Sequence, residues 1–120
     1  MAAQKSSKKI LTNLLTLQGV NAVAVIGRDG FVIESDYKTD IDLDALGAVV
    51  STGYGSSEIM ASEMNLGKID QIMIECDEGK ILMADCGGHS VLAVITNSNA
   101  IVGNVRHHIT KIIDDLTAAI

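Results

Sequence analysis

The chain has 120 residues, 48% of them hydrophobic, and a formal net charge of −6. A core of this size folds without a disulfide or a metal. Only Phe31, Tyr37 and Tyr54 are aromatic, so we expect no base-stacking surface and no aromatic ligand cage. Residues 34–78 carry eleven acids against two lysines, and such a surface would repel a phosphate backbone or an anionic membrane.

One domain is expected over residues 1–120, with residues 1–8 flexible and Ser7 as the cap of a first helix that ends before Gly19. The N-terminal residues lack an apolar leader segment, and no apolar run reaches membrane-spanning length. Cys76 and Cys86 lie in apolar runs and are interpreted as buried thiols in a reducing setting. These features predict a cytoplasmic protein.

Strands are predicted at 20–26, 31–35, 69–76, 81–85 and 91–96. The first and last of these are apolar on both faces, which predicts central strands with cover on both sides. Gly27-Arg28-Asp29-Gly30 predicts a hairpin turn between the first two strands. The strand at 69–76 alternates between apolar and polar residues, which is typical of an edge or interface strand.

A long second helix, capped by Asp40 or Asp42, is predicted to run to Met64 and to be closed by Gly67. A last helix is predicted after a cap at Ser98 or Asn99, with Ile109 and Leu116 on its apolar stripe. The order is therefore α-β-β-α-β-β-β-α. Its helices must cover both sides of one largely antiparallel sheet, because the central strands are apolar on both faces.

Nothing in the sequence has the pattern of a catalytic or cofactor site. His107 and His108 point about 100° apart on a helix and cannot chelate one ion together. Ser56-Ser57 lacks a nucleophile elbow, and the glycine pairs match no nucleotide-binding motif. We expect no enzyme activity, no cofactor and no metal.

The second helix is unusual because one of its faces is small and nearly free of charge. A helical wheel places eight residues toward the sheet: Leu43, Leu46, Val50, Gly53, Ser57, Met60, Ala61 and Met64. The expected outer, partner-binding face consists of Ala48, Ser51, Thr52, Gly55, Glu58, Ile59 and Ser62. Gly53 is interpreted as a close helix–sheet contact, and Gly55 as a site where another protein approaches.

Several stretches resemble the Roadblock/dynein light chain family along nearly the whole chain. They are Leu17-Gln18-Gly19-Val20, Val25 to Ile33, the Leu46 to Met64 helix, Ile72-Met73-Ile74-Glu75 and Ala93-Val94-Ile95-Thr96. The subgroup that looks most similar is the free-standing prokaryotic proteins related to the gliding-motility regulator MglB.

The resemblance implies a three-layer, profilin-like fold with a five-stranded antiparallel sheet. The long helix covers one face, and the two terminal helices cover the other. It also implies a homodimer that pairs the third strand, with Ile69, Gln71, Met73 and Glu75 as its residues, and sets the second helices side by side.

The resemblance further implies a small Ras-like GTPase as partner, bound over the paired helices. Family members either modulate GTP hydrolysis or act as scaffolds. The helix offers no arginine finger, since Arg28 and Arg106 lie outside it. The alternative function is a small-molecule sensor, which would require an enclosed pocket with convergent polar groups.

Overall fold

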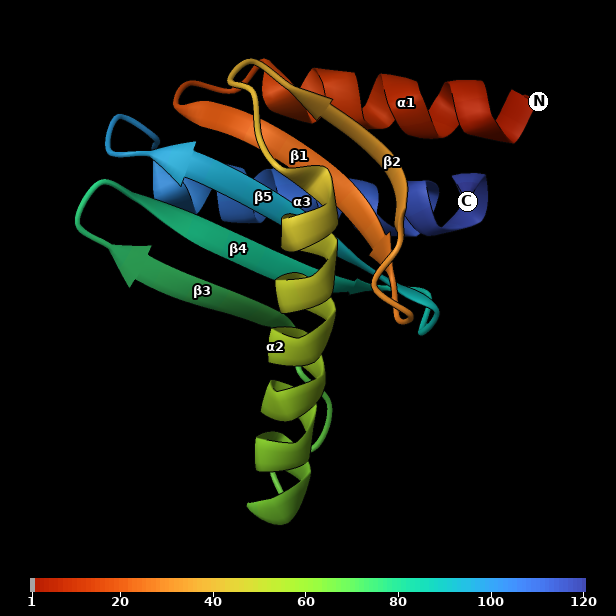
Figure 1. The fold of residues 1–120 in the computed structure, drawn as a ribbon, viewed down its shortest axis with the longest axis vertical. Coiled ribbons are helices and arrows are strands. Elements are labelled where there is room, and N and C mark those ends of the chain that lie inside the picture. The colour runs from red at the N-terminus through yellow and green to blue at the C-terminus, as the bar shows by residue number, and fades with distance from the viewer. Residues whose placement is uncertain (1) are drawn as a thin grey trace.

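The computed structural model describes residues 2–120, with side chains from Ser6 onward. In this part of the chain three helices and five strands follow one another in the predicted order (Figure 1). Their bounds are α1 Ala2–Leu15, β1 Val20–Gly27, β2 Val32–Tyr37, α2 Leu43–Glu63, β3 Gln71–Cys76, β4 Gly79–Cys86, β5 Ser90–Asn97 and α3 Val102–Ala119. None of the described helices is long and apolar enough to cross a membrane.

The sheet has the strand order β2-β1-β5-β4-β3, and all its neighbours are antiparallel. β1 and β5 lie inside the sheet and are buried on both faces, as their sequences predict. β2 and β3 form the two edges, which confirms the edge position predicted for the third strand.

Two separate groups of buried side chains hold the layers together. The larger group joins α1 and α3 to one sheet face and includes Leu11, Val23, Leu92, Ile109 and Leu116. The smaller group joins α2 to the other face. Its members are Ala24, Ile26, Val50, Tyr54, Met83, Val91 and Ala93. This three-layer arrangement confirms the predicted fold class.

α2 crosses the sheet and then extends past the edge formed by β3 (Figure 1). Of the two predicted caps Asp42 is the one used, because its side chain accepts a hydrogen bond from the Ala45 N–H at 3.1 Å. The buried residues Gly47, Val50 and Tyr54 all lie in the half that covers the sheet. The C-terminal end of α2 projects past β3 in Figure 1, and Ile59, Met60 and Met64 at this end are more than 60% exposed; we call residues 59–64 the overhang.

Two predicted helix starts are wrong. α1 begins at Ala2 rather than after Ser7, because Ala2, Ala3, Gln4 and Lys5 are good helix formers. The flexibility expected for residues 1–8 stays a prediction. Neither Ser98 nor Asn99 caps α3: the side chain of Asn97 accepts the Asn99 N–H at 2.8 Å in a turn, and the helix starts at Val102 without a side-chain cap.

Candidate functional site

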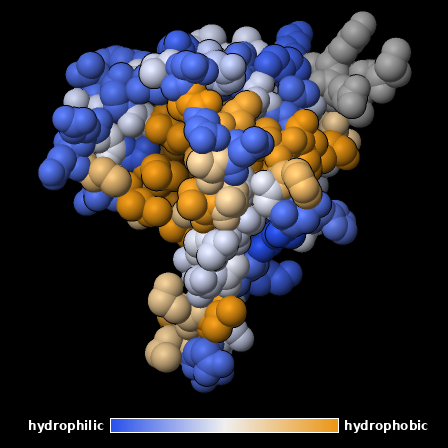
Figure 2. Space-filling view, in the orientation of Figure 1, coloured by the Kyte–Doolittle hydropathy of each residue, from blue (hydrophilic) through white to orange (hydrophobic). Residues whose placement is uncertain are grey.

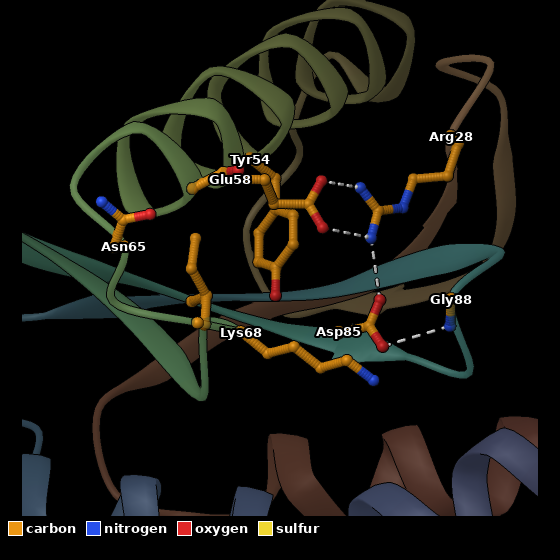
Figure 3. Close-up of a pocket in the computed structure, with 10 residues that line it drawn as sticks. Arg28, Tyr54, Glu58, Asn65, Lys68, Asp85 and Gly88 are labelled. Carbon is orange, nitrogen blue, oxygen red and sulfur yellow. Dashed lines mark hydrogen bonds and ion pairs between the residues drawn. The ribbon is translucent and has the colours of Figure 1, made fainter.

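Arg28 links three segments that are distant in the sequence (Figure 3). It lies in the turn between β1 and β2, and its two terminal nitrogens donate to Glu58 of α2 at 2.5 and 3.1 Å. One of them also donates to Asp85 of β4 at 2.8 Å. A guanidinium with two carboxylates in this geometry ties the turn, the helix and the sheet together.

Tyr54 completes the Arg28 cluster. The guanidinium carbon of Arg28 lies 4.9 Å from the centroid of the Tyr54 ring, within cation–π range. The bond to Glu58 raises the pKa of Arg28 further above its ordinary value. Burial, followed by the charges of Asp85 and Glu58, raises the pKa of Tyr54.

A hollow of about 690 Å³ lies beside the Arg28 cluster, between α2 and the segment that leads into β3. It is lined by Ser62, Asn65, Gly67, Lys68, Ile69 and Gly88 in addition to the cluster. The carboxylates are already engaged, since Asp85 also accepts the Gly88 N–H at 3.1 Å. The hollow is partly open to solvent, so it is not the enclosed pocket that a sensor needs.

The predicted faces of α2 are rotated from the observed ones by about 60°, at 100° per residue. The residues that meet the sheet are Gly47, Val50 and Tyr54, whereas Met60 and Met64, which the wheel placed there, are 63% and 67% exposed. The reason is the overhang: apolar residues beyond Glu58 have no sheet of their own chain to meet.

Two predicted partner-binding residues, both partly exposed, make contacts within the chain. Ser51 borders the β1–β2 turn, where a Cβ on Gly30 would lie 3.4 Å from its hydroxyl oxygen, and Glu58 is bound to Arg28. The interpretation that Arg28 lies outside the docking helix is therefore incomplete, because its side chain contacts α2. The others stay at the surface: Ala48, Thr52, Ile59 and Ser62 are exposed and Gly55 is half-buried.

The close contact of α2 with the sheet layer is made by Gly47, not by Gly53 as predicted. A Cβ on Gly47 would lie 2.2 Å from the carbonyl oxygen of Gly30. A Cβ on Gly53 or Gly55 would meet nothing within 4 Å. The two outer glycines are therefore not required by packing within the chain.

β3 begins at Gln71, so Ile69 lies just before the strand and packs against the smaller core. The Gln71 amide donates to the Arg106 carbonyl and to the Thr110 hydroxyl of α3, both at 3.2 Å. Met73 and Glu75 are exposed. Cys76 is also exposed, which corrects its interpretation as a buried thiol, whereas Cys86 is buried.

In the described part of the chain no three His, Cys, Asp or Glu residues gather as a metal site would require. His107 and His108 stand edge to face with ring centroids 6.2 Å apart.

Of the residues in the Arg28 cluster, the sequence predicted a functional role only for Glu58. Gly47, Val50 and Tyr54 recur at helical spacing along one side of α2, and this pattern could have identified the face that meets the sheet.

A family model for the Roadblock/LC7 domain matches residues 7–96. The chain belongs to the Roadblock/LC7 family. An uncharacterized protein of Methanocaldococcus jannaschii, MJ0310, is 33% identical over 110 residues, which are 92% of this chain and 96% of that protein.

Two solved structures place this Roadblock/LC7 chain among known folds. The gliding protein MglB from Thermus thermophilus has a TM-score of 0.91 over 99% of this chain and 91% of its own, at 18% identity. Acanthamoeba castellanii profilin IB has a TM-score of 0.65 over 94% and 98%, at 15% identity. The fold is therefore that of Roadblock domains and profilin, and it is structurally close to MglB.

Proposed function

We propose that this Roadblock/LC7 chain is a non-catalytic homodimer that binds a small Ras-like GTPase and modulates its GTP hydrolysis or its localisation. The observation that carries the proposal is the overhang of α2. It presents Met60 and Met64 to solvent, and these large apolar side chains have no cover in their own chain.

A second copy joined at β3 would supply that cover. Its sheet would continue the first one past the edge, directly under the overhang. By symmetry its own overhang would reach the sheet surface beside α2, where Ile72, Ile74 and Ile81 are incompletely buried. Figure 2 shows hydrophobic surface both on the sheet beside α2 and at the far end of the overhang.

The two sheet edges differ in a way that favours pairing at β3. On β2, Lys8 donates to the Ser35 carbonyl at 2.5 Å, and the Tyr37 N–H donates to the Asp36 carboxylate at 2.9 Å. Side chains thus occupy backbone groups that another strand would need. Among the described residues β3 pairs with β4 alone, and no side chain bonds to its backbone.

The surface proposed for the GTPase is the exposed side of the paired α2 helices. Ala48, Thr52, Gly55, Ile59 and Ser62 carry no charge, and small side chains let another backbone approach closely. Together with membership of the Roadblock/LC7 family and the structural likeness to MglB, this surface supports a docking function.

The test is binding of a Ras-like GTPase from the native host to the purified protein, in its GTP and GDP forms, with GTP turnover measured on the complex. Gly55→Arg should weaken binding at least tenfold, because the arginine would fill the small face. Gly103→Arg is the matched control, since a Cβ there also meets nothing within 4 Å but lies on α3. If Gly55→Arg binds and dimerises like the wild type, or if no Ras-like GTPase binds in either form, the proposal is wrong.

A further inference from the structure

Phe31 is the chain's single phenylalanine, and it lies 73% exposed directly after the β1–β2 turn. Ile33, two residues further on, is 51% exposed. Both line a shallow hollow of about 380 Å³ that also includes His89. Large apolar side chains gathered at the surface mark places where another molecule binds. The fold gives no internal reason for the exposure of Phe31 and Ile33.

A groove of about 490 Å³ lies on the other side of Phe31, between the turn and the first half of α2. Phe31 forms one wall, and Ala48, Ser51 and Thr52 of α2 line the groove with short side chains. Asp29 and Asp44 line it as well. We call this the Phe31 groove. It is wide enough for a side chain and its neighbours from another protein.

The walls of the Phe31 groove are fixed relative to one another. The carbonyl of Gly30 packs against Gly47 so closely that only a glycine fits there, and Gly30 itself has a φ of +91°. Arg28 ties the same turn to Glu58 further along α2. A groove that exists before binding loses little conformational entropy when it is occupied.

The groove is negatively charged, because it carries two carboxylates that no described cation pairs. Within the described part of the chain neither Asp29 nor Asp44 forms an ion pair. Asp29 accepts the Phe31 N–H with one oxygen at 3.1 Å. Arg28, the neighbouring cation, is bound to Glu58 and Asp85, and residues 39–67 contain no Lys, Arg or His.

We propose that the Phe31 groove docks a segment of a partner protein that presents an apolar side chain flanked by lysine or arginine. The apolar side chain packs against Phe31 and Ala48, and the cations meet Asp29 and Asp44. The inference rests on the proposed function in taking α2 as a docking face. Because the β1–β2 turn adjoins the edge opposite β3, a dimer paired at β3 leaves that edge of the sheet free.

The test uses a fluorescein-labelled ten-residue peptide of alternating leucine and arginine, titrated with the full-length protein and followed by fluorescence anisotropy. Phe31→Ser, and separately Asp29→Asn combined with Asp44→Asn, should each raise Kd at least tenfold. The matched controls are Ile101→Ser, an exposed apolar residue before α3, and Asp114→Asn combined with Asp115→Asn on α3. They should change Kd less than twofold.

A second peptide of alternating leucine and glutamate should bind at least tenfold more weakly than the cationic one. The inference is overturned if the acidic peptide binds equally well, if the controls weaken binding as much as the groove variants, or if the cationic peptide does not bind at millimolar concentration. These outcomes concern the groove alone. The proposed GTPase function fails by a separate measurement, the comparison of Gly55→Arg with Gly103→Arg.

Discussion

Three glycines of α2 share a helical backbone but differ in what surrounds them. Gly47 touches the β1–β2 turn, whereas Gly53 and Gly55 face open space. A glycine inside a helix is less favourable than alanine by about 1 kcal/mol. Only at Gly47 does packing within the chain require a glycine and so account for this loss of helix stability. At Gly53 and Gly55 the lack of a side chain would instead let a bound partner approach the helix closely.

Gly47→Ala should therefore destabilise the protein, and Gly53→Ala combined with Gly55→Ala should stabilise it. The first introduces a Cβ 2.2 Å from the Gly30 carbonyl oxygen, and overpacking of this kind destabilises by about 1–3 kcal/mol. The second gains helix propensity of up to about 1 kcal/mol per site. Urea unfolding midpoints measure both. Equal effects of the two changes would contradict the assignment of the inner face.

Tyr54 predicts a loss of stability in alkaline solution. Its folded-state pKa is raised above the ordinary value of 10.0, chiefly by burial, so the folded state keeps the proton after the unfolded state has lost it. This contribution is fully present below pH 10 and is lost as the pH rises through the folded pKa. Unfolding midpoints measured from pH 9 to 11 should fall less steeply in Tyr54→Phe, and identical slopes would contradict the prediction.

At the scale of secondary-structure elements, α2 is held to the sheet by a small apolar contact and the Arg28 cluster. The apolar group on that side is the smaller of the two cores. Arg28 adds bonds to Glu58 and Asp85 together with its contact over Tyr54. The cluster therefore helps to set the direction in which the overhang leaves the sheet.

Arg28→Met should lower the free energy of unfolding by about 1–2 kcal/mol, because partly exposed ion pairs and cation–π contacts each contribute about 1 kcal/mol or less. It should also speed hydrogen exchange in α2. Lys111→Met on α3 is the control, because Lys111 is exposed and forms no ion pair among the described residues. A change within 0.5 kcal/mol, about the size of an ordinary surface substitution, would show that the cluster does not hold the helix.

The order of elements could be predicted from the sequence because strand alternation, turn glycines and the long helix each leave a local pattern. Two such local patterns are the helix cap, in which Asp42 accepts the Ala45 N–H, and the turn from Gly27 to Gly30. The inner face of α2 could not be placed correctly, since the wheel averaged the half on the sheet with the overhang. Met60 and Met64 lie on a stripe that the chain itself does not cover.

The Arg28 cluster could not be predicted from the sequence either. Arg28 and Asp85 are 57 residues apart, and only the register of β4 against β5 brings Asp85 to the end of the sheet where the β1–β2 turn lies. Likewise the Phe31 groove depends on the contact between Gly30 and Gly47, two residues from different elements. Sites assembled by packing between distant segments have no local pattern.

At the scale of the whole molecule, the sheet has one edge occupied by side chains and one open edge, with a helix projecting beyond the open one (Figure 1). An unpaired strand edge beside exposed apolar side chains is prone to pair with another protein chain. The proposed dimer would close the edge and cover the overhang in one step, and the paired helices would form the surface offered to the GTPase.

The mass in solution, measured by sedimentation equilibrium, tests this account most directly. The wild type should sediment as a species of about 25 kDa, twice the 12.6 kDa of one chain. Ile74→Lys on β3 should give single chains, whereas the matched change Ile33→Lys on β2 should leave the dimer intact. A wild-type protein that stays at 12.6 kDa at high micromolar concentration, or equal effects of the two substitutions, would contradict the central claim.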